Sequence, residues 1–130
     1  MARVLFVCLH NAGRSQMSQA LFERAVNGAH SARSAGTSPA ESVHPSVVDA
    51  MGEIGIDLSR LKPQLLTSDV AEQADVVVTM GCGDACPVIP GKRYVDWRLP
   101  DPGGMTLADV RNLRDEIDAR VRALAAQLDL

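Results

Sequence analysis

The stretch Val4–Ser15, which reads VLFVCLHNAGRS, decides how this chain folds. Its first four residues form an uninterrupted apolar run, which is typical of a strand buried on both faces of a sheet. The run passes into a turn-like segment at residues 8–13. From Arg14 onward the apolar residues recur at every third or fourth position, which indicates a helix that ends near Asn27.

The rest of the chain repeats this alternation of strands and helices. Residues 75–80 carry three consecutive valines and form the strongest strand signal in the sequence. Apolar residues at helical spacing over 107–128 predict a long amphipathic helix, which Thr106 is placed to cap. The other predicted elements are strands at 30–35 and 92–97, a helix at 47–55 and a short helix at 68–74 that begins with Ser68 as its cap.

Alternating strands and helices predict an α/β fold, namely a three-layer, four-stranded parallel sheet flanked by helices. The 130 residues suit one domain, and no linker, repeat or low-complexity segment divides them, so we expect residues 1–130 to be a single domain. Ligands of parallel sheets bind at the carboxyl ends of the strands. Cys8, Cys82 and Asp101 each follow a predicted strand, so we expect them to meet at one edge.

The composition excludes several classes of protein. A hydrophobic fraction of 46% with 22% charged residues is ordinary for a globular domain and excludes a disordered or fibrous chain. The net charge of −3 provides no general field that attracts nucleic acid or an anionic membrane, so any anion site must be local. No apolar run approaches the roughly 18 residues of a membrane span, and the first residues lack a signal-peptide pattern. We expect a cytoplasmic monomer.

The three cysteines favour catalytic, redox or metal-binding thiols over structural disulfides, because their number is odd and the cytoplasm is reducing. Cys82 and Cys86 lie close together in the predicted loop 81–91. They are candidates for resolving thiols, for unreactive loop thiols or for zinc ligands. The histidines that a zinc site would add are scattered without paired spacing, so we expect no metal site; they are His10, His30 and His44.

The strongest chemical signal is Cys8 followed six residues later by Arg14 and then by Ser15, between a strand and a helix. A loop of this length can curl its backbone N–H groups around a tetrahedral oxyanion at the positive end of the helix dipole. Arg14 can bind two oxygens, and the same positive field favours a Cys8 thiolate, to which Ser15 can donate. The residues expected to bind the anion are Leu9, His10, Asn11, Ala12, Gly13, Arg14 and Ser15.

Asp101 precedes a proline and two glycines in the loop after the last predicted strand. Taken alone, an Asp-Pro pair is most often a turn. Taken with Cys8 and Arg14, it is a candidate general acid that protonates a departing oxygen. The glycines after it leave an open rim that suits a small inorganic oxyanion.

The segment Cys8–Ser15 resembles the phosphate-binding loop of the low-molecular-weight protein tyrosine phosphatase fold, and Asp101-Pro102 resembles its general-acid loop. This fold is host to two chemistries, phosphatases and arsenate reductases coupled to thioredoxin or mycothiol. Hydrolysis of a phosphate ester needs one nucleophilic cysteine, whereas reduction of arsenate needs two more electrons from a pair of thiols. Three cysteines therefore favour an arsenate reductase that serves in arsenic detoxification. The resemblance covers essentially the whole chain, through Ser34–Thr37, His44-Pro45, Gly55–Ser59 and Val76–Met80.

The reductases imply a sequence of thiol steps. Cys8 attacks arsenate held by the loop and Arg14, and Asp101 protonates the departing oxygen. Cys82 then attacks the sulfur of Cys8, which releases arsenite, and Cys86 attacks Cys82. The product is a Cys82–Cys86 disulfide that an external thiol reductant such as thioredoxin reopens, with no bound cofactor.

The spacing of Cys82 and Cys86 keeps alternatives to this scheme open. Only three residues separate Cys82 from Cys86, fewer than in the well-known thioredoxin-coupled enzymes. Mycothiol with mycoredoxin is therefore an alternative reductant, and a low-molecular-weight protein tyrosine phosphatase is an alternative function.

Some thioredoxin-coupled enzymes also bind potassium near the loop, but Gln19 stands where they have a carboxylate, so we predict no cation here.

Overall fold

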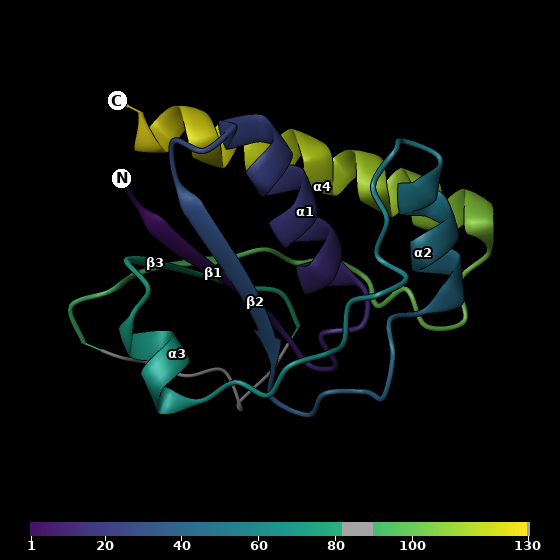
Figure 1. The fold of residues 1–130 in the computed structure, drawn as a ribbon, viewed down its shortest axis with the longest axis horizontal. Coiled ribbons are helices and arrows are strands. Elements are labelled where there is room, and N and C mark those ends of the chain that lie inside the picture. Colours follow the sequence, from purple (N-terminus) through teal and green to yellow (C-terminus); the bar gives the residue numbers. More distant parts are fainter. Residues whose placement is uncertain (82–89, 130) are drawn as a thin grey trace.

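The structure is a computed structural model that describes residues 1–81 and 90–129. Within these residues, all strands are parallel and form one sheet in the order β2-β1-β3-β4 (Figure 1). This arrangement confirms the predicted four-stranded parallel sheet. The strands are β1 (Arg3–Cys8), β2 (Ser31–Gly36), β3 (Val76–Thr79) and β4 (Arg93–Asp96).

Helices lie on both faces of the sheet, which confirms the predicted three-layer α/β class. Figure 1 shows α1, α2 and α4 together on one face and the short α3 on the other. None of the helices in the described residues is long and apolar enough to cross a membrane. The helices are α1 (Arg14–Val26), α2 (Pro45–Gly52), α3 (Ser68–Glu72) and α4 (Leu107–Leu128).

The strand β1 is buried on both faces, as its continuous apolar run predicted. Because side chains alternate along a strand, Phe6 and Cys8 enter the larger core under α1, α2 and α4. Leu5 and Val7 enter the smaller core under α3. The Phe6 ring contacts that of Trp97, the single tryptophan of the chain, at a centroid distance of 5.9 Å, so the segment after β4 packs on the same face as Cys8.

The ends of the helices follow their local chemistry, with one correction. Thr106 caps α4 as predicted, because its side-chain oxygen accepts from the backbone N–H of Asp109. The prediction that Ser68 caps α3 was wrong. Thr67 is the cap, since its backbone is extended and its hydroxyl oxygen accepts from the N–H of Val70, whereas Ser68 is already helical.

The helix α2 is tied to α4 by Glu53, which follows its last residue. Arg111 donates from Nε to the Glu53 carboxylate at 2.9 Å, and Arg114 donates at 3.0 Å. The hydrogen bond from Arg111 is the largest cause that lowers the pKa of Glu53 from its usual 4.5 to about 2. The link therefore stays ionised in mild acid, and it holds α2 where the start of that helix meets the loop after β1.

The carboxyl ends of the strands meet at one edge, as predicted for a parallel sheet. Cys8 ends β1, Gly81 lies two residues after β3, and Asp101 follows β4. The chain passes from β1 through α1 to β2 on one side, while β3 pairs with β1 on the other. A reversal of strand order of this kind opens a crevice at the carboxyl end of the central strand, where ligands bind.

We expect the larger core to depend strongly on Ile117 of α4, whose side chain is fully buried. Ile117→Ala should lower the free energy of unfolding by about 2–5 kcal/mol, because it removes buried methylene groups and leaves a cavity. The measurement is urea unfolding followed by circular dichroism. The control is Glu116→Ala, which removes only an exposed ion pair with Arg120 and should cost roughly 0.5 kcal/mol or less. Equal losses in the two variants would contradict the assignment of Ile117 to the core.

Candidate active site

The loop after β1 is shaped by a second segment, residues 37–44, that runs along its outer side. In a planar trans peptide the C=O and the following N–H point in opposite directions. Four carbonyl oxygens of the loop bond outward to this segment. The N–H group that follows each of them, in residues 9, 10, 11 and 13, therefore points inward. The outward bonds run from the N–H groups of Thr37, Ser38, Ala40 and His44 to the carbonyl oxygens of Cys8, Leu9, His10 and Ala12, respectively, at 2.8–3.3 Å.

Close packing against Gly36 holds the loop at this position. A Cβ at Gly36 would lie only 2.8 Å from the carbonyl oxygen of Leu9 and 2.9 Å from the backbone nitrogen of Asn11. Such distances are shorter than real side-chain contacts, so the loop can approach β2 only because this position has no side chain. Gly36 also pairs with Cys8 across β1 and β2, so it lies directly beside the sulfur-bearing residue.

Several backbone donors of the loop have no acceptor within the described part of the chain. In residues 1–81 and 90–129, the N–H groups of Ala12, Gly13 and Arg14 donate to no oxygen, although all three residues are buried. Buried backbone N–H groups are almost always paired in proteins, so unpaired ones need an explanation. Because Arg14 begins α1, these donors also lie at the positive end of a helix. An oxyanion in the loop would pair them.

The sulfur of Cys8 is buried among hydrogen-bond donors. It lies 2.9 Å from the Ser15 hydroxyl and accepts from the backbone N–H of Asn11 at 3.3 Å. The Ser15 oxygen itself accepts from the side-chain amide of Asn11 at 2.7 Å, so the Ser15 proton is free to point at the sulfur. The amide of Asn11 must turn its NH₂ group to Ser15, because its oxygen already accepts from the backbone N–H of Gln64 at 2.8 Å. The sulfur therefore lies where two donors can hydrogen-bond to it.

Asn11 holds an uncommon backbone conformation at the centre of this network. Its φ is 49° and it is fully buried. Asparagine tolerates the left-handed region better than most residues, which fits the turn that the loop makes here. The oxygen of its amide also accepts from Gln16 at 3.0 Å. Sequence reasoning found Asn11 but not Gln16 or Gln64, because nothing in their local pattern separates them from ordinary surface amides.

Arg14 places a buried charge at the same edge. Its side chain is only 7% exposed, and Nη1 donates to the carbonyl oxygen of Leu99 at 3.2 Å. Its Nε is buried and has no acceptor among the described residues. A buried donor without a partner is costly, so the free Nε marks a place where an anion would complete the hydrogen bonding.

Asp101 lies across from Arg14 with a separation of 3.9 Å between its Oδ2 and Nη2. Its other oxygen accepts from the backbone N–H of Gly103 at 2.9 Å, and the side chain is half exposed. The next residue, Pro102, packs so closely on Gly13 that a Cβ on Gly13 would overlap with its ring. The loop after β4 therefore rests on the loop after β1, with the Asp101 carboxyl beside the Arg14 guanidinium and open to solvent.

The remaining predicted site residues have different outcomes. His10 lies on the outer side of the loop, where its Nδ1 faces the carbonyl oxygen of Ser38 at 3.1 Å and must donate to it. Cys82 and Cys86 lie outside the described residues. Among the described residues, no group of three or more histidine, cysteine or acidic side chains is arranged to hold a metal ion.

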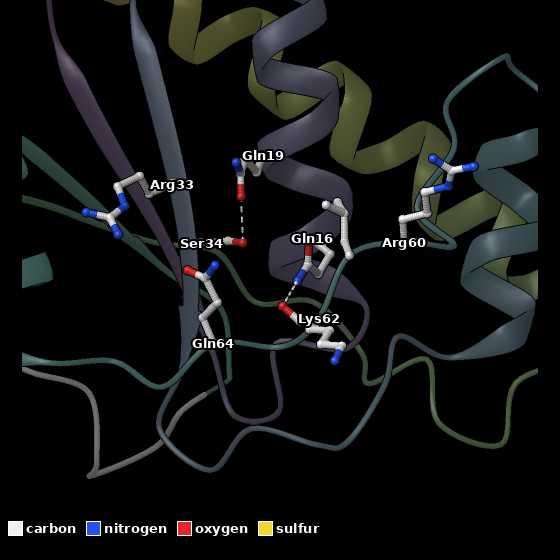
Figure 2. Close-up of a pocket in the computed structure, with 8 residues that line it drawn as sticks. Gln16, Gln19, Arg33, Ser34, Arg60, Lys62 and Gln64 are labelled. Carbon is white, nitrogen blue, oxygen red and sulfur yellow. Dashed lines mark hydrogen bonds between the residues drawn. The ribbon is translucent and has the colours of Figure 1, made fainter.

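A polar pocket of about 390 Å³ adjoins the loop after β1 on the side of β2 (Figure 2). Figure 2 shows Ser34 pointing toward Gln19, to which it donates at 2.7 Å, and Gln16 pointing toward the carbonyl oxygen of Lys62. The lining contains amides, one hydroxyl and basic side chains but no carboxylate. Such a set is a poor match for a cation, which prefers oxygen ligands with negative charge.

We predict that the Ser15 hydroxyl supports the reactivity of the Cys8 sulfur. In a Cys82→Ser/Cys86→Ser background, where Cys8 is the single thiol, Ser15→Ala should slow the alkylation of Cys8 by iodoacetamide by about tenfold, because a hydrogen bond to a charged group contributes about 1.5–3 kcal/mol. The measurement is the second-order rate constant of alkylation at one fixed pH. The control is Ser18→Ala, which removes a buried hydroxyl of the same helix that bonds to Arg14 O and not to Cys8. An unchanged rate constant in Ser15→Ala would rule out this role.

The family model for low molecular weight phosphotyrosine protein phosphatase matches residues 3–130. A putative arsenate reductase of Halobacterium salinarum is 42% identical over 121 residues, which cover 89% of this chain and 85% of that protein. An arsenate reductase of Brevibacillus brevis is 36% identical over 126 residues, which cover 94% and 92% of the two chains.

A solved structure extends the similarity. The thioredoxin-dependent arsenate reductase Cg_ArsC1′ of Corynebacterium glutamicum superposes with a TM-score of 0.84 at 42% identity. The match covers all of this chain and 64% of that one, so this chain spans under two thirds of that relative's length. These findings confirm the resemblance that the sequence indicated. The chain belongs to the low molecular weight phosphotyrosine protein phosphatase family.

Proposed function

We propose that this protein reduces arsenate to arsenite with its own thiols and is regenerated by an external thiol reductant, as part of arsenic detoxification. The observation that carries the proposal is the buried Cys8 sulfur, which accepts from Asn11 and Ser15 beneath a loop whose N–H groups include several without an acceptor among residues 1–81 and 90–129. Two relatives support the same reaction, one named a putative arsenate reductase at 42% identity and one named an arsenate reductase at 36% identity.

The first step joins sulfur to arsenic. Arsenate sits in the loop, where the inward N–H groups and the free Nε of Arg14 neutralise its charge. The Cys8 thiolate attacks arsenic(V), a sulfur–arsenic bond forms and an arsenic–oxygen bond breaks. Asp101 gives its proton to the departing oxygen, which leaves as water. The half-exposed position of Asp101 lets it take a proton back from solvent.

The second step transfers two electrons. The Cys82 thiolate attacks the sulfur of Cys8, and the electron pair of the sulfur–arsenic bond stays on arsenic, which leaves as arsenite in the arsenic(III) state. Cys86 then attacks Cys82, which frees Cys8 as a thiolate and leaves a Cys82–Cys86 disulfide. The oxidation of two thiols to one disulfide balances the reduction of arsenic. Gly81, the residue before Cys82 in the sequence, lies against Arg14.

The reductant that reopens the disulfide is proposed to be thioredoxin. The Corynebacterium glutamicum relative, at 42% identity, is named as thioredoxin-dependent, which supports this choice. Mycothiol with mycoredoxin is the alternative, because the spacing of three residues between Cys82 and Cys86 is short. In that route a small thiol takes the place of Cys82 as the attacking group, and Cys86 is not needed.

A phosphatase is the second candidate function. The same loop, Arg14 and Asp101 suit a phosphate ester, and the family model carries the name of phosphotyrosine phosphatases. Phosphate hydrolysis proceeds through a single cysteine, followed by attack of water on the phosphorylated sulfur. The two functions therefore differ in whether they need a thiol besides Cys8.

We expect Cys82→Ser to abolish arsenate turnover while any hydrolysis of p-nitrophenyl phosphate is retained, because only the reduction passes through this sulfur. The measurement is arsenite formation with thioredoxin, thioredoxin reductase and NADPH, next to release of p-nitrophenol. Cys8→Ser is the control and should abolish both activities. Parallel loss of both in Cys82→Ser would contradict a resolving role, and a wild type that forms no arsenite but hydrolyses the ester would favour the phosphatase.

Cys86→Ser separates the two reductants. With thioredoxin, turnover should fall at least about a hundredfold, because the variant stops at the Cys8–Cys82 disulfide after one cycle. With mycothiol and mycoredoxin in place of thioredoxin, an enzyme of the mycothiol type would keep its rate. Full turnover of Cys86→Ser with thioredoxin would show that this thiol has no part in the electron transfer.

A further inference from the structure

Gly81 lies so close to the guanidinium of Arg14 that a residue with a side chain would not fit in this arrangement. A Cβ built on Gly81 would overlap with Nη1 of Arg14 and would lie 3.0 Å from Cζ and 3.4 Å from Nη2. All three contacts are with the charged group itself and none is with the stem of the side chain. The backbone at the end of β3 therefore forms one wall of the space that the guanidinium occupies.

The position of the guanidinium is constrained on its other sides. The side chain is 7% exposed, and Nη1, the atom nearest to Gly81, also donates to the carbonyl oxygen of Leu99. Nη2 faces Asp101 and Nε is left without an acceptor among the described residues. A methyl group at position 81 would push Nη1 away from its place, and the whole planar fork would turn with it.

The displaced group is the far end of a flexible side chain and not a strand or helix. The protein can therefore absorb a side chain at position 81 by moving Arg14 without unfolding. What changes is the direction of Nε and Nη2, the donors that are left for an anion. A bidentate contact with an oxyanion depends on the plane of the fork, so a turned guanidinium binds less well even though its charge is unchanged.

We propose that Gly81 is a positioning residue, whose missing side chain sets the guanidinium of Arg14 for a tetrahedral oxyanion. The identity of that oxyanion as arsenate rests on the proposed function, whereas the steric relation does not. Gly81 acts through Arg14 and itself contacts neither substrate nor the reacting sulfur. The sequence pattern around Gly81 indicates only that a strand ends there and gives no sign of a role at the anion site.

A glycine at this position also satisfies the backbone, because φ of Gly81 is +89° and side chains disfavour this region. Gly28 separates the two roles. It has the same φ of +89°, and a Cβ there would meet nothing within 4 Å. Gly28→Ala and Gly81→Ala thus share the backbone penalty, and only the second places a methyl group on a functional side chain.

The experiment measures binding of inorganic phosphate by isothermal titration calorimetry to the full chain and four variants: Gly81→Ala, Gly28→Ala, Arg14→Ala and the double variant Arg14→Ala/Gly81→Ala. Gly81→Ala and Gly28→Ala should lower the melting temperature by similar amounts. Gly81→Ala should weaken phosphate binding about tenfold or more, as expected when a charge-assisted contact is lost, while Gly28→Ala binds as the wild type does. In the Arg14→Ala background, the Gly81→Ala change should add no further loss.

Two results would overturn the proposal. One is phosphate binding in Gly81→Ala as tight as in Gly28→Ala. The other is a loss in the double variant that equals the sum of the two single losses, because Gly81 would then act independently of Arg14. Arsenate turnover of the wild type, measured in parallel, tests the proposed function separately. A wild type that binds phosphate through Arg14 but forms no arsenite refutes the reductase and leaves the role of Gly81 standing.

Discussion

The site depends on the hydrogen bonds that the side-chain amide of Asn11 makes. Its oxygen accepts from the backbone of Gln64, 53 residues away, and its nitrogen donates to Ser15, which in turn faces the sulfur of Cys8. One amide thus joins a distant segment, the loop after β1 and the Cys8 thiol in a single chain of hydrogen bonds. Because the backbone of Asn11 is in the left-handed region, these bonds also hold a conformation that few residues adopt.

The site contains hydrogen-bond donors that are not paired with any acceptor in the described residues. The buried Nε of Arg14 and the N–H groups at the start of α1 have no acceptor in the described residues. Unpaired buried donors cost stability, which the burial of β1 and α4 in the larger core offsets. The result is a cluster of hydrogen-bond donors around the Cys8 sulfur, which is the preorganised arrangement that the proposed attack on an oxyanion requires.

Much of this architecture was predictable because it is local. The apolar run before Cys8, the helical spacing after Arg14 and the threonine before the long helix each act over a few residues, and the strands and helices confirm them. The cap of α3 was misassigned by one position because serine and threonine are adjacent there, and only the backbone angles show that Thr67 stays extended while Ser68 turns helical.

The sequence by itself determined the element order, the parallel sheet and the strand–loop–helix that holds Cys8 and Arg14, since these follow from periodicity and from residue types at short spacing. The tertiary structure alone decided which distant backbone groups complete the site. Gln64, Leu99 and Gly81 reach it through a backbone N–H, a carbonyl oxygen and the absence of a side chain, respectively. Every residue has a backbone and many positions tolerate glycine, so such contacts leave no mark in the sequence. They arise only when packing of the sheet and helices brings separate segments together.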